Sequence, residues 1–530
     1  MSTVAPLSPP VPPVTDVPAP DLPAPDLPAP DLPAIVRVDP ADQVGVALRP
    51  LVVGEVVRVA GHALTVADPI ATGHKIALAA IAAGDDVRRY GWPIGRATAA
   101  IAAGRHVHSH NLATKLSGEE PYRYDPAPVP APAPASIPGR AQGFRGYVRG
   151  DGSVGTRNQI WVIPTVGCVG RTAQRVAMAA AKASGVDDVL AFAHPFGCSQ
   201  LGDDLDGTAR VLAALACHPN AGGVLLLGLG CEENQLSALL DRLPPERRDR
   251  VRSVGAQLSA DEYGDAARAI AELGEIAGQD RRTEVGLDAL RLGLKCGGSD
   301  GFSGLTANPL IGRAADAVTA AGGTAILTEI PEMFGAERLL MARTRDEATF
   351  DRLVALVNDF KRYFLDHGEP ISENPSPGNV EGGITTLEEK SLGAVQKGGR
   401  AIVTDVLGYG ERVRRPGLVV LEAPGNDAVS TTALAAAGAT LTLFSTGRGT
   451  PLGSPVPTMK LATNHGLAAR KPGWIDFDAG AVLDAPPEGG LDATADALMA
   501  RICAVASGEP ARNEVNEERE IALWKRGVTL

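Results

Sequence analysis

The residues best suited to chemistry lie in one glycine-rich loop, Lys295-Cys296-Gly297-Gly298-Ser299-Asp300-Gly301-Phe302-Ser303-Gly304-Leu305-Thr306-Ala307-Asn308-Pro309. The loop offers a thiol, hydroxyls, a carboxylate and an amide, and its glycines let the backbone approach a ligand closely. An apolar run at 290–294 predicts a strand before it, and helical spacing at 310–321 predicts a helix after it. Because ligands bind at the carboxyl ends of strands in open α/β sheets, this loop predicts a ligand site. The alternative is a capped glycine-rich turn that only connects two elements.

Three more cysteines stand in the same setting, directly after a predicted strand: Cys168, Cys198 and Cys231. In a parallel sheet the carboxyl ends of the strands line one edge, so these three and Cys296 would converge on one crevice. Thiolates favour soft or borderline metals such as iron, although the spacing matches no common iron–sulfur run. For any one of them, packing as a small buried hydrophobe is the alternative. The strands concerned are predicted at 159–164, 189–193, 223–229 and 290–294, with helices at 172–183 and 203–215 after the first two.

Histidines cluster near the N-terminal end of the folded chain. His106, His108 and His110 alternate, so on a strand all three would project from one face. With His74 nearby, the imidazoles predict a divalent metal site. The alternative is a polar strand that contacts substrate or solvent.

Carboxylates and basic groups follow other predicted strands. Glu329 and Glu332 come after the strand at 325–327 and suit a metal ligand or a base, with helix capping as the alternative. His194 follows the strand at 189–193. Arg448 lies in a glycine-flanked loop, where a guanidinium can clamp a carboxylate in a bidentate fork. Lys460, Thr463 and Asn464 extend this polar set.

Composition narrows the class of protein. The 530 residues carry 50 basic and 62 acidic side chains, a formal charge of −12, with no clustered basic footprint for nucleic acid. The six cysteines contain no CxxC pair and indicate cytosolic thiols rather than disulfides. We see neither a signal peptide nor an apolar run of membrane-spanning length, so we expect a cytoplasmic protein.

The chain divides at two proline-rich stretches. Residues 1–34 repeat Pro-Ala-Pro-Asp-Leu and predict a disordered tail, and 117–140 predict an extended Pro/Ala linker. We therefore expect an α/β protein in which a small β-rich domain at 35–116 precedes a large catalytic part with parallel sheets. That part would comprise an α/β domain at 141–365 and a C-terminal α/β domain at 366–530 that completes the active site.

Five segments resemble the altronate dehydratase and galactarate dehydratase family of sugar-acid dehydratases, and the likeness extends over roughly residues 37 to 480. It implies that the β-rich domain is SAF-like and lies over the substrate site, and that the cofactor is Fe(2+) or Mn(2+). One departure is Gly425-Asn426-Asp427, where relatives often carry Gly-x-Asp followed by proline. The segments are 73–78, 106–112, 296–309, 328–337 and 379–393.

The resemblance implies a metal-dependent hydro-lyase in hexuronate catabolism that converts D-altronate to 2-dehydro-3-deoxy-D-gluconate and water. The alternatives are a galactarate or other aldonate or aldarate dehydratase, a sulfo-lyase on a related 2-hydroxy acid, and a non-catalytic sugar-acid sensor. We expect a small sugar acid as the substrate, neither nucleic acid nor membrane as a partner, and leave a homo-oligomer open. The predicted catalytic residues are His74, His194, Cys296, Ser299, Asp300 and Glu332; the predicted substrate-binding residues are Lys75, Arg157, Asn308, Lys390, Arg448, Lys460 and Asn464; and the predicted metal ligands are Cys168, Cys198, Cys231, Cys296, His106 and His108.

Overall fold

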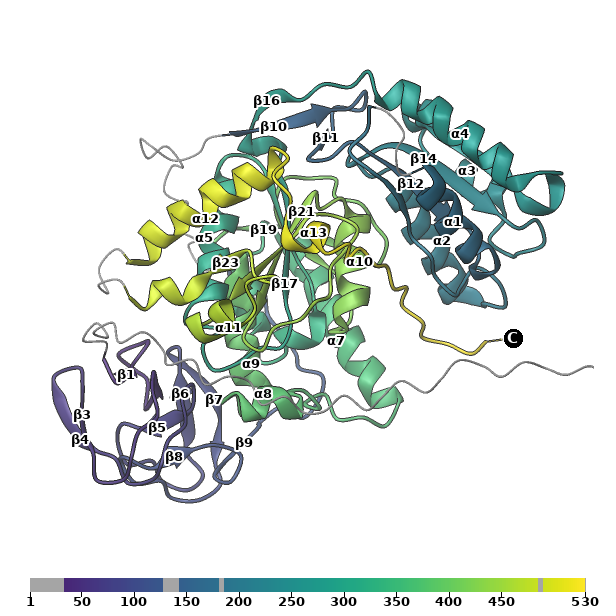
Figure 1. Cartoon of the computed structure of the whole chain (residues 1–530). Coiled ribbons are helices and arrows are strands. Elements are labelled where there is room, and N and C mark those ends of the chain that lie inside the picture. Colours follow the sequence, from purple (N-terminus) through teal and green to yellow (C-terminus); the bar gives the residue numbers. More distant parts are fainter. Residues whose placement is uncertain (1–32, 127–142, 181–184, 485–489, 530) are drawn as a thin grey trace, which may run out of the picture. The chain divides into compact units, whose positions relative to one another are not determined.

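The computed structural model describes residues 33–126, 143–180, 185–484 and 490–529 (Figure 1). The predicted N-terminal tail, except residues 33 and 34, and most of the predicted Pro/Ala linker lie outside the described residues. The expected class, an α/β protein with a small β-rich N-terminal part, is confirmed. No helix among the described residues is long and apolar enough to cross a membrane.

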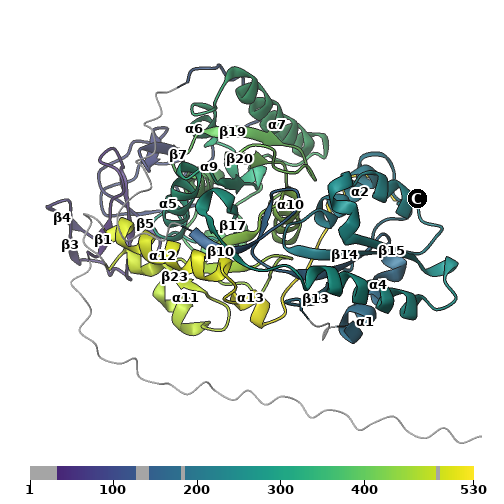
Figure 2. The same cartoon turned by 90° about the horizontal axis from the view of Figure 1, so that it is seen from above.

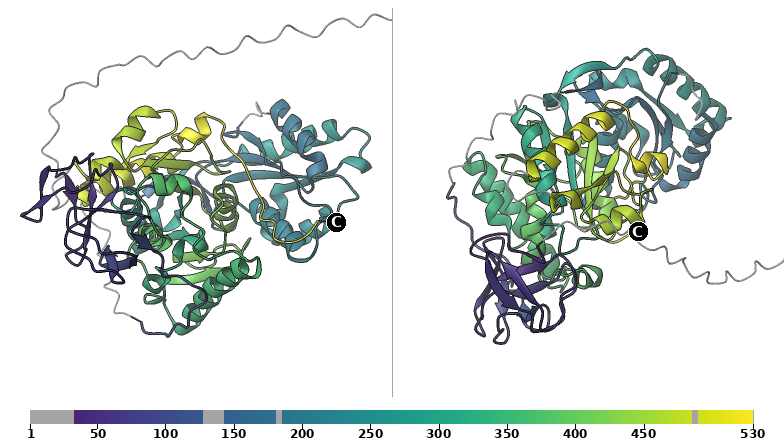
Figure 3. Two further views of the ribbon diagram at one scale, coloured as in Figure 1. Left: turned by 90° about the horizontal axis from the view of Figure 1, so that it is seen from below. Right: turned by 60° about the vertical axis from the view of Figure 1, so that its left-hand side comes forward.

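The small N-terminal part is built from short antiparallel strands (purple in Figures 1 and 3). One sheet has the order β1-β2-β5-β8, a second has the order β6-β7-β9, and β3 pairs with β4. Alternate residues of β3 and β6 point into the core, the pattern expected for strands with one buried face. The strands are β1 (Ile35–Val36), β2 (Val44–Ala47), β3 (Val56–Val59), β4 (His62–Thr65), β5 (Lys75–Ala77), β6 (Asp86–Arg89), β7 (Trp92–Ala97), β8 (His106–Val107) and β9 (Leu112–Ala113).

A four-stranded parallel sheet of order β13-β12-β14-β15 follows, covered by helices on both faces (Figure 2). Ile160 and Val162 of β12 pack with α1 and α4, whereas Trp161 and Ile163 pack with α2 on the other face. Such continuous apolar strands are typical of parallel sheets buried on both sides. The elements are β12 (Gln159–Pro164), α1 (Gly170–Ala180), β13 (Val189–Ala191), α2 (Gly202–Ala216), β14 (Ala221–Gly228), α3 (Leu236–Asp241), β15 (Val251–Gly255) and α4 (Glu262–Ala277).

A seven-stranded parallel sheet forms the rest of the body, in the order β19-β20-β18-β17-β21-β22-β23. Leu292 and Leu294 of β17 pack with α5, and Ile326 of β18 packs with α10 in another cluster. The elements are β17 (Arg291–Cys296), α5 (Ala307–Ala320), β18 (Thr324–Leu327), α6 (Glu337–Met341), α7 (Glu347–Asp366), α8 (Pro377–Glu381), α9 (Leu387–Ala394), β19 (Val403–Leu407), β20 (Gly417–Leu421), α10 (Asp427–Ala437), β21 (Leu441–Thr446), β22 (Thr458–Ala462), α11 (His465–Arg470), β23 (Phe477–Asp478), α12 (Gly490–Ala506) and α13 (Arg512–Val515).

Two findings change the expected division of the chain. The boundary expected at 365/366 lies within the seven-stranded sheet, because β17 and β18 precede it and the other strands follow it. A separate antiparallel sheet, β11 (Val154–Gly155), β10 (Gly143–Val148) and β16 (Thr283–Gly286), pairs the segment before the four-stranded sheet with the segment after it. The four-stranded sheet is therefore a closed unit within the chain, and the seven-stranded sheet begins after it.

Candidate active site

Five adjacent strands of the seven-stranded sheet, β20-β18-β17-β21-β22, carry polar side chains at their carboxyl ends. Because the strands are parallel, these ends meet at one edge, where ligands bind in open α/β sheets. The residues are Asp427 after β20, Glu329 and Glu332 after β18, Cys296 at the end of β17, Arg448 after β21, and Thr463 and Asn464 after β22.

Cys296, Glu329 and Glu332 form a buried group that we call the thiol–carboxylate centre. The Cys296 Sγ lies 3.2 Å from Glu332 Oε2 and 3.5 Å from Glu329 Oε2. The Cys296 N–H also donates to Glu329 Oε2 at 3.0 Å. One ligand atom from each side chain lies within 4.8 Å of the others, and all three residues are buried, so the centre could hold a metal ion.

Three lysines surround the centre and neutralise its carboxylates. Lys397 Nζ lies 2.7 Å from Cys296 Sγ and 3.2 Å from Glu329 Oε2. Lys390 Nζ donates to Glu332 Oε1 at 2.8 Å. Lys295 pairs with Glu329, and its Nζ lies 2.8 Å from Asp427 Oδ1. A buried charge is costly unless it is paired and hydrogen-bonded, so these ion pairs explain how so many charges are buried together.

Burial and these charges set the protonation of the centre. Burial, together with Glu329 and Glu332, raises the pKa of the Cys296 thiol to about 12. Burial acts to raise the pKa of the Glu332 carboxyl too, but the ammonium groups of Lys390, Lys295 and Lys397 outweigh it and lower that pKa to about 2. Glu332 is therefore ionised at neutral pH and can serve as a ligand, whereas the thiol needs a cation to lose its proton.

The backbone at Glu329 is unusual for a side chain of this size. Its φ of 70° and ψ of 60° lie in the left-handed region. Such a conformation costs on the order of 1–3 kcal/mol outside glycine and persists only where its surroundings enforce it. Here the turn between β18 and the short helix Ile330–Met333 aims the carboxylate at Lys295 and at the Cys296 N–H.

Asp300 organises the glycine-rich loop that follows β17. Its Oδ1 accepts from the Phe302 N–H and the Ser303 hydroxyl, each at 3.1 Å. Its Oδ2 accepts from the Thr463 hydroxyl at 2.9 Å and from Asn464 Nδ2 at 3.2 Å. Burial raises the pKa of the Asp300 carboxyl. The loop is thereby tied to the ends of both β17 and β22.

The other predicted residues of the loop also lie at this edge. Asn308 accepts from the Ser445 hydroxyl at 2.6 Å and donates to the Gly393 carbonyl at 3.0 Å. The Ser299 carbonyl accepts from Asn379 Nδ2 at 2.8 Å, and Asn379 Oδ1 lies 3.2 Å from Lys390 Nζ. Segment 379–390 therefore connects the loop to the thiol–carboxylate centre.

Four histidines of the small β-rich part form an imidazole cluster: His74, His106, His108 and His110. The rings of His74, His106 and His108 lie 4.9–5.3 Å apart between centroids, and His110 lies 5.4 Å from His106. The predicted strand is shorter than expected, because β8 ends at Val107 and His110 lies in the turn that follows. A tight turn, rather than alternation along a strand, keeps the rings together.

The hydrogen bonds of the imidazole cluster fix two tautomers. His74 Nε2 lies 3.1 Å from the Glu381 carbonyl oxygen, which can only accept, so His74 Nε2 carries the proton. His74 Nδ1 then accepts from His106 Nε2 at 3.1 Å, which leaves His106 Nδ1 as the unprotonated nitrogen. Burial and the neighbouring histidines lower the pKa of His106 to about 4, and burial and Lys75 do the same for His108. His106 and His108 are therefore neutral at neutral pH.

A buried ion pair joins the small β-rich part to α9. Lys75 Nζ donates to Glu389 Oε2 at 2.9 Å, and Arg89 pairs with Glu389 Oε1. Gly301 also touches this part, since a Cβ on it would lie 2.0 Å from the Gly73 carbonyl oxygen. These contacts bring His74 and Lys75 to the glycine-rich loop, as expected, but the Lys75 ammonium is already occupied by Glu389.

Three predicted residues lie away from the thiol–carboxylate centre. Arg157 pairs with Glu514 at 2.7 Å and donates to C-terminal carbonyls. His194 uses both ring nitrogens on backbone groups, at 2.8 Å to the Pro164 carbonyl and 3.2 Å to the Phe196 N–H. Lys460 is buried against Glu518 at 2.9 Å and the Pro451 carbonyl at 2.6 Å. Arg448 is on the rim, paired with Glu381 at 2.7 Å and about half exposed.

The four cysteines do not share one sheet edge. Cys296 ends β17 in the seven-stranded sheet and is buried. Cys168, Cys198 and Cys231 follow β12, β13 and β14 in the four-stranded sheet and are exposed.

Sequence reasoning missed Lys397 and Asp427 as members of the site and treated Lys295 only as the start of the loop. Lys397 and Lys295 contact the thiol–carboxylate centre directly, and Asp427 pairs with Lys295. For Lys295 the available signal was a lysine within an apolar strand, because a charge at such a position needs a buried partner.

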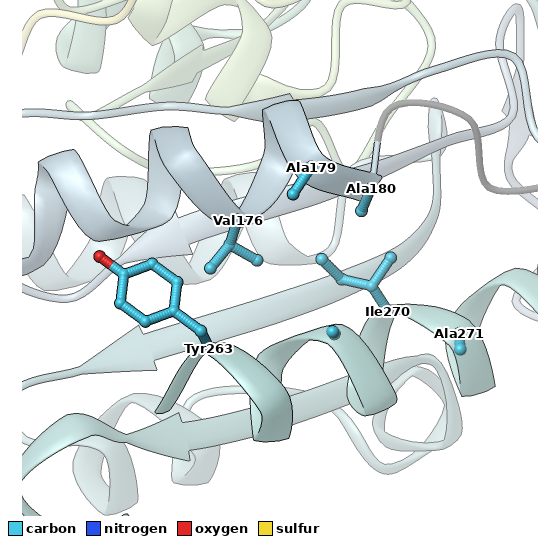
Figure 4. Close-up of a pocket in the computed structure, with 7 residues that line it drawn as sticks. Val176, Ala179, Ala180, Tyr263, Ile270 and Ala271 are labelled. Carbon is cyan, nitrogen blue, oxygen red and sulfur yellow. The ribbon is translucent and has the colours of Figure 1, made fainter. Parts of the chain in front are cut away.

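An apolar hollow on the four-stranded unit is not part of this site. Figure 4 shows its side chains projecting from α1 and α4 toward one another. Among the described residues that line it, Tyr263 alone has an ionisable side chain, and the lining is otherwise apolar. It is lined by Val176, Ala179, Ala180, Tyr263, Ala267, Ile270 and Ala271.

Three family descriptions match successive parts of the chain. They are "Altronate/galactarate dehydratase SAF domain" at residues 33–115, "D-galactarate dehydratase/Altronate hydrolase, second domain" at 146–278, and "D-galactarate/Altronate dehydratase, C-terminal" at 287–529. The second and third matches coincide with the four-stranded unit and the seven-stranded sheet.

Curated proteins match over most of the chain. It is 49% identical over 501 residues to an altronate dehydratase of Escherichia coli strain K12, which covers 93% of this chain and 99% of that protein. It is 45% identical over 501 residues to an altronate dehydratase of Bacillus subtilis strain 168, covering 94% and 100%. A galactarate dehydratase (L-threo-forming) of E. coli K12 is 33% identical over 481 residues, covering 84% and 88%.

Proposed function

Because this chain belongs to the D-galactarate/altronate dehydratase family, and is thus a hydro-lyase acting on a sugar acid, we propose that its substrate is D-altronate. The product would be 2-dehydro-3-deoxy-D-gluconate, formed with water in hexuronate catabolism. The higher identity to the altronate dehydratases than to the galactarate dehydratase supports altronate over galactarate.

The observation that carries the proposal is the thiol–carboxylate centre at the carboxyl ends of β17 and β18. Dehydration removes the proton at C2, next to the carboxylate, and then the hydroxyl at C3. The C2 proton is weakly acidic, so the enediolate that forms needs positive charge placed beside it. Lys295, Lys390 and Lys397 supply such charge at this edge even before a metal binds.

The donors of the centre fit a divalent Fe(2+) or Mn(2+) ion. One sulfur and two carboxylates converge in a buried site, and Glu332 is held ionised. A mixed soft and hard donor set of this kind suits borderline and hard divalent metals. Bound there, the ion would act as a Lewis acid toward the substrate oxygens.

The imidazole cluster supplies acid–base groups in this proposal. Its neutral His74–His106 pair leaves His106 Nδ1 free to accept a proton, and a lowered pKa keeps it unprotonated at neutral pH. Arg448, half exposed on the rim, would clamp the substrate carboxylate once it exchanges Glu381 for the ligand. In this scheme His194, Arg157 and Lys460 stabilise the fold and do not contact the substrate.

The test is anaerobic turnover of aldonates and aldarates by the full chain loaded with Fe(2+) or Mn(2+), scored by 2-keto-3-deoxy acid formation. We expect product from altronate, and its loss after chelation. Product from galactarate alone would replace the substrate assignment. A folded, metal-loaded chain that forms no product from any acid would refute the proposal.

Two variants separate the roles. Glu329→Gln should lose bound metal, whereas His106→Gln should keep the metal and lose exchange of the substrate C2 proton with deuterated water. If His106→Gln loses the metal and Glu329→Gln retains it, the ion belongs to the imidazole cluster instead.

A further inference from the structure

The four-stranded unit carries three cysteines that the dehydratase proposal does not use. Cys168, Cys198 and Cys231 are exposed, whereas the other cysteines, Cys217, Cys296 and Cys503, are buried. Free cysteine is among the residues most often buried. Three exposed thiols in one small unit are therefore unusual as packing residues.

The three thiols lie on loops that are hydrogen-bonded to one another. The N–H of Gly167, next to Cys168, donates to the Phe196 carbonyl at 2.8 Å. The carbonyl of Gly197, next to Cys198, accepts from the Asn234 N–H at 3.1 Å. Asn234, three residues after Cys231, also donates through Nδ2 to the Thr165 carbonyl at 3.1 Å. These bonds hold the three cysteine loops together at the carboxyl edge of β13-β12-β14.

The backbone of these loops is shaped for close approach. Gly197 has φ 102°, and a Cβ there would lie 2.1 Å from the Thr165 carbonyl oxygen. Ser199, a non-glycine residue, has φ 56°. Left-handed conformations of this kind outside glycine are concentrated at functional sites.

The spacing favours a cluster of metal ions over a single ion. Adjacent strands lie about 4.8 Å apart, so loops from three adjacent strands start across roughly twice that distance. A single ion draws every ligand to one point, and these three sulfurs do not lie within 4.8 Å of one another, unlike the donors of the thiol–carboxylate centre. In a cubane cluster each thiolate binds a different iron, so its sulfurs are held further apart.

The polar side chains near the three thiols have other partners. The three cysteines therefore remain as the protein ligands. Both ring nitrogens of His194 are engaged by backbone groups. Gln257 Nε2 lies 3.5 Å from Cys231 Sγ and can donate to a sulfur. Glu233 accepts from the Ser199 N–H at 2.7 Å and from the Cys198 thiol, a bond that cluster binding would replace.

We propose that Cys168, Cys198 and Cys231 bind a [4Fe–4S] cluster, with the fourth iron left open to an oxygen ligand such as water or a hydroxyl. Binding from a preformed cluster is ligand exchange without a change of redox state. Three protein thiols replace three small thiolates on the irons, and those thiolates leave carrying the three protons.

The experiment is anaerobic incubation of the full chain with a [4Fe–4S] complex of small thiolates, followed by desalting. We expect about four iron and four sulfide retained per chain, visible cluster absorption and, after reduction, an electron paramagnetic resonance signal. Cys168→Ser, Cys198→Ser and Cys231→Ser should each lose most of the retained sulfide. These thiols are exposed, so the variants should keep the wild-type circular dichroism and melting temperature, which would be measured alongside.

Cys217→Ala is the matched control, because this thiol is buried at the end of α2, and it should retain the wild-type cluster content. Iron bound without sulfide, zinc bound in its place, or cluster retained in the three serine variants would overturn the proposal. The readout is bound sulfide rather than turnover, so its failure is separate from failure of the dehydratase assignment.

Discussion

Glu389→Gln tests how far the molecule depends on one buried carboxylate. Glu389 and Lys75 have side chains 1% and 0% exposed, and Glu389 is also the partner of Arg89. The substitution keeps the shape of the side chain but leaves two buried cations without an anion. Removing one partner of a buried pair costs about 3–5 kcal/mol, much of it from the uncompensated charge that remains.

The assay is urea unfolding followed by circular dichroism, compared with Asp86→Asn. Asp86 pairs with Lys115 at 2.8 Å in the same small β-rich part, but both side chains are about one-third exposed. A surface pair contributes roughly 1 kcal/mol or less. We therefore expect Glu389→Gln to lower the free energy of unfolding several-fold more than Asp86→Asn does. Equal losses would refute the claim that the buried pair stabilises the contact with α9.

Glu329→Gln should weaken the affinity for Fe(2+) or Mn(2+) about tenfold or more, measured by competition with a chelator; unchanged affinity would place the ion elsewhere. Gly301→Ala should lower stability by about 1–3 kcal/mol because its Cβ meets the Gly73 carbonyl, whereas Gly378→Ala, with open space around it, should not; equal melting temperatures would contradict this. Burial lowers the pKa of His218 to about 3, so folding favours its neutral form. Stability should be full above about pH 6.5 and fall by about 1.4 kcal/mol per pH unit toward pH 3, and a His218→Gln variant should fall less in that window.

Much of the fold follows from local sequence patterns. The strand predicted at 159–164 has the same bounds as β12, because apolar runs between polar turns mark buried parallel strands. The helix predicted at 203–215 differs from α2 by one residue at each end. The bounds of such strands and helices are set by residues close together in the sequence. They can therefore be predicted from the sequence.

The site was predicted less completely because its members come from distant segments. The positions of Cys296 and Glu332 after strands were readable, and the structure brings their side chains to 3.2 Å. Lys397 lies in a stretch with no motif, yet its Nζ is 2.7 Å from the same sulfur. Such a contact depends on how the chain packs α9 and its following turn against β17, which local periodicity does not encode.

The cysteines illustrate the limit most directly. Three of the four follow a strand, as predicted, and Cys296 is the last residue of its strand, β17. The order of strands in a sheet depends on which strands pair, and that cannot be read from local patterns. Because β10 pairs with β16 across the intervening chain, the strands before residue 287 close into their own unit, and β17 starts another sheet. The four cysteines that were predicted to share one crevice therefore lie in two sites with different chemistry. Cys296 is buried among carboxylates and ammonium groups, where only a cation can compete for its proton. The exposed three face solvent on hydrogen-bonded loops, where a larger sulfur-bound cofactor has room to reach them.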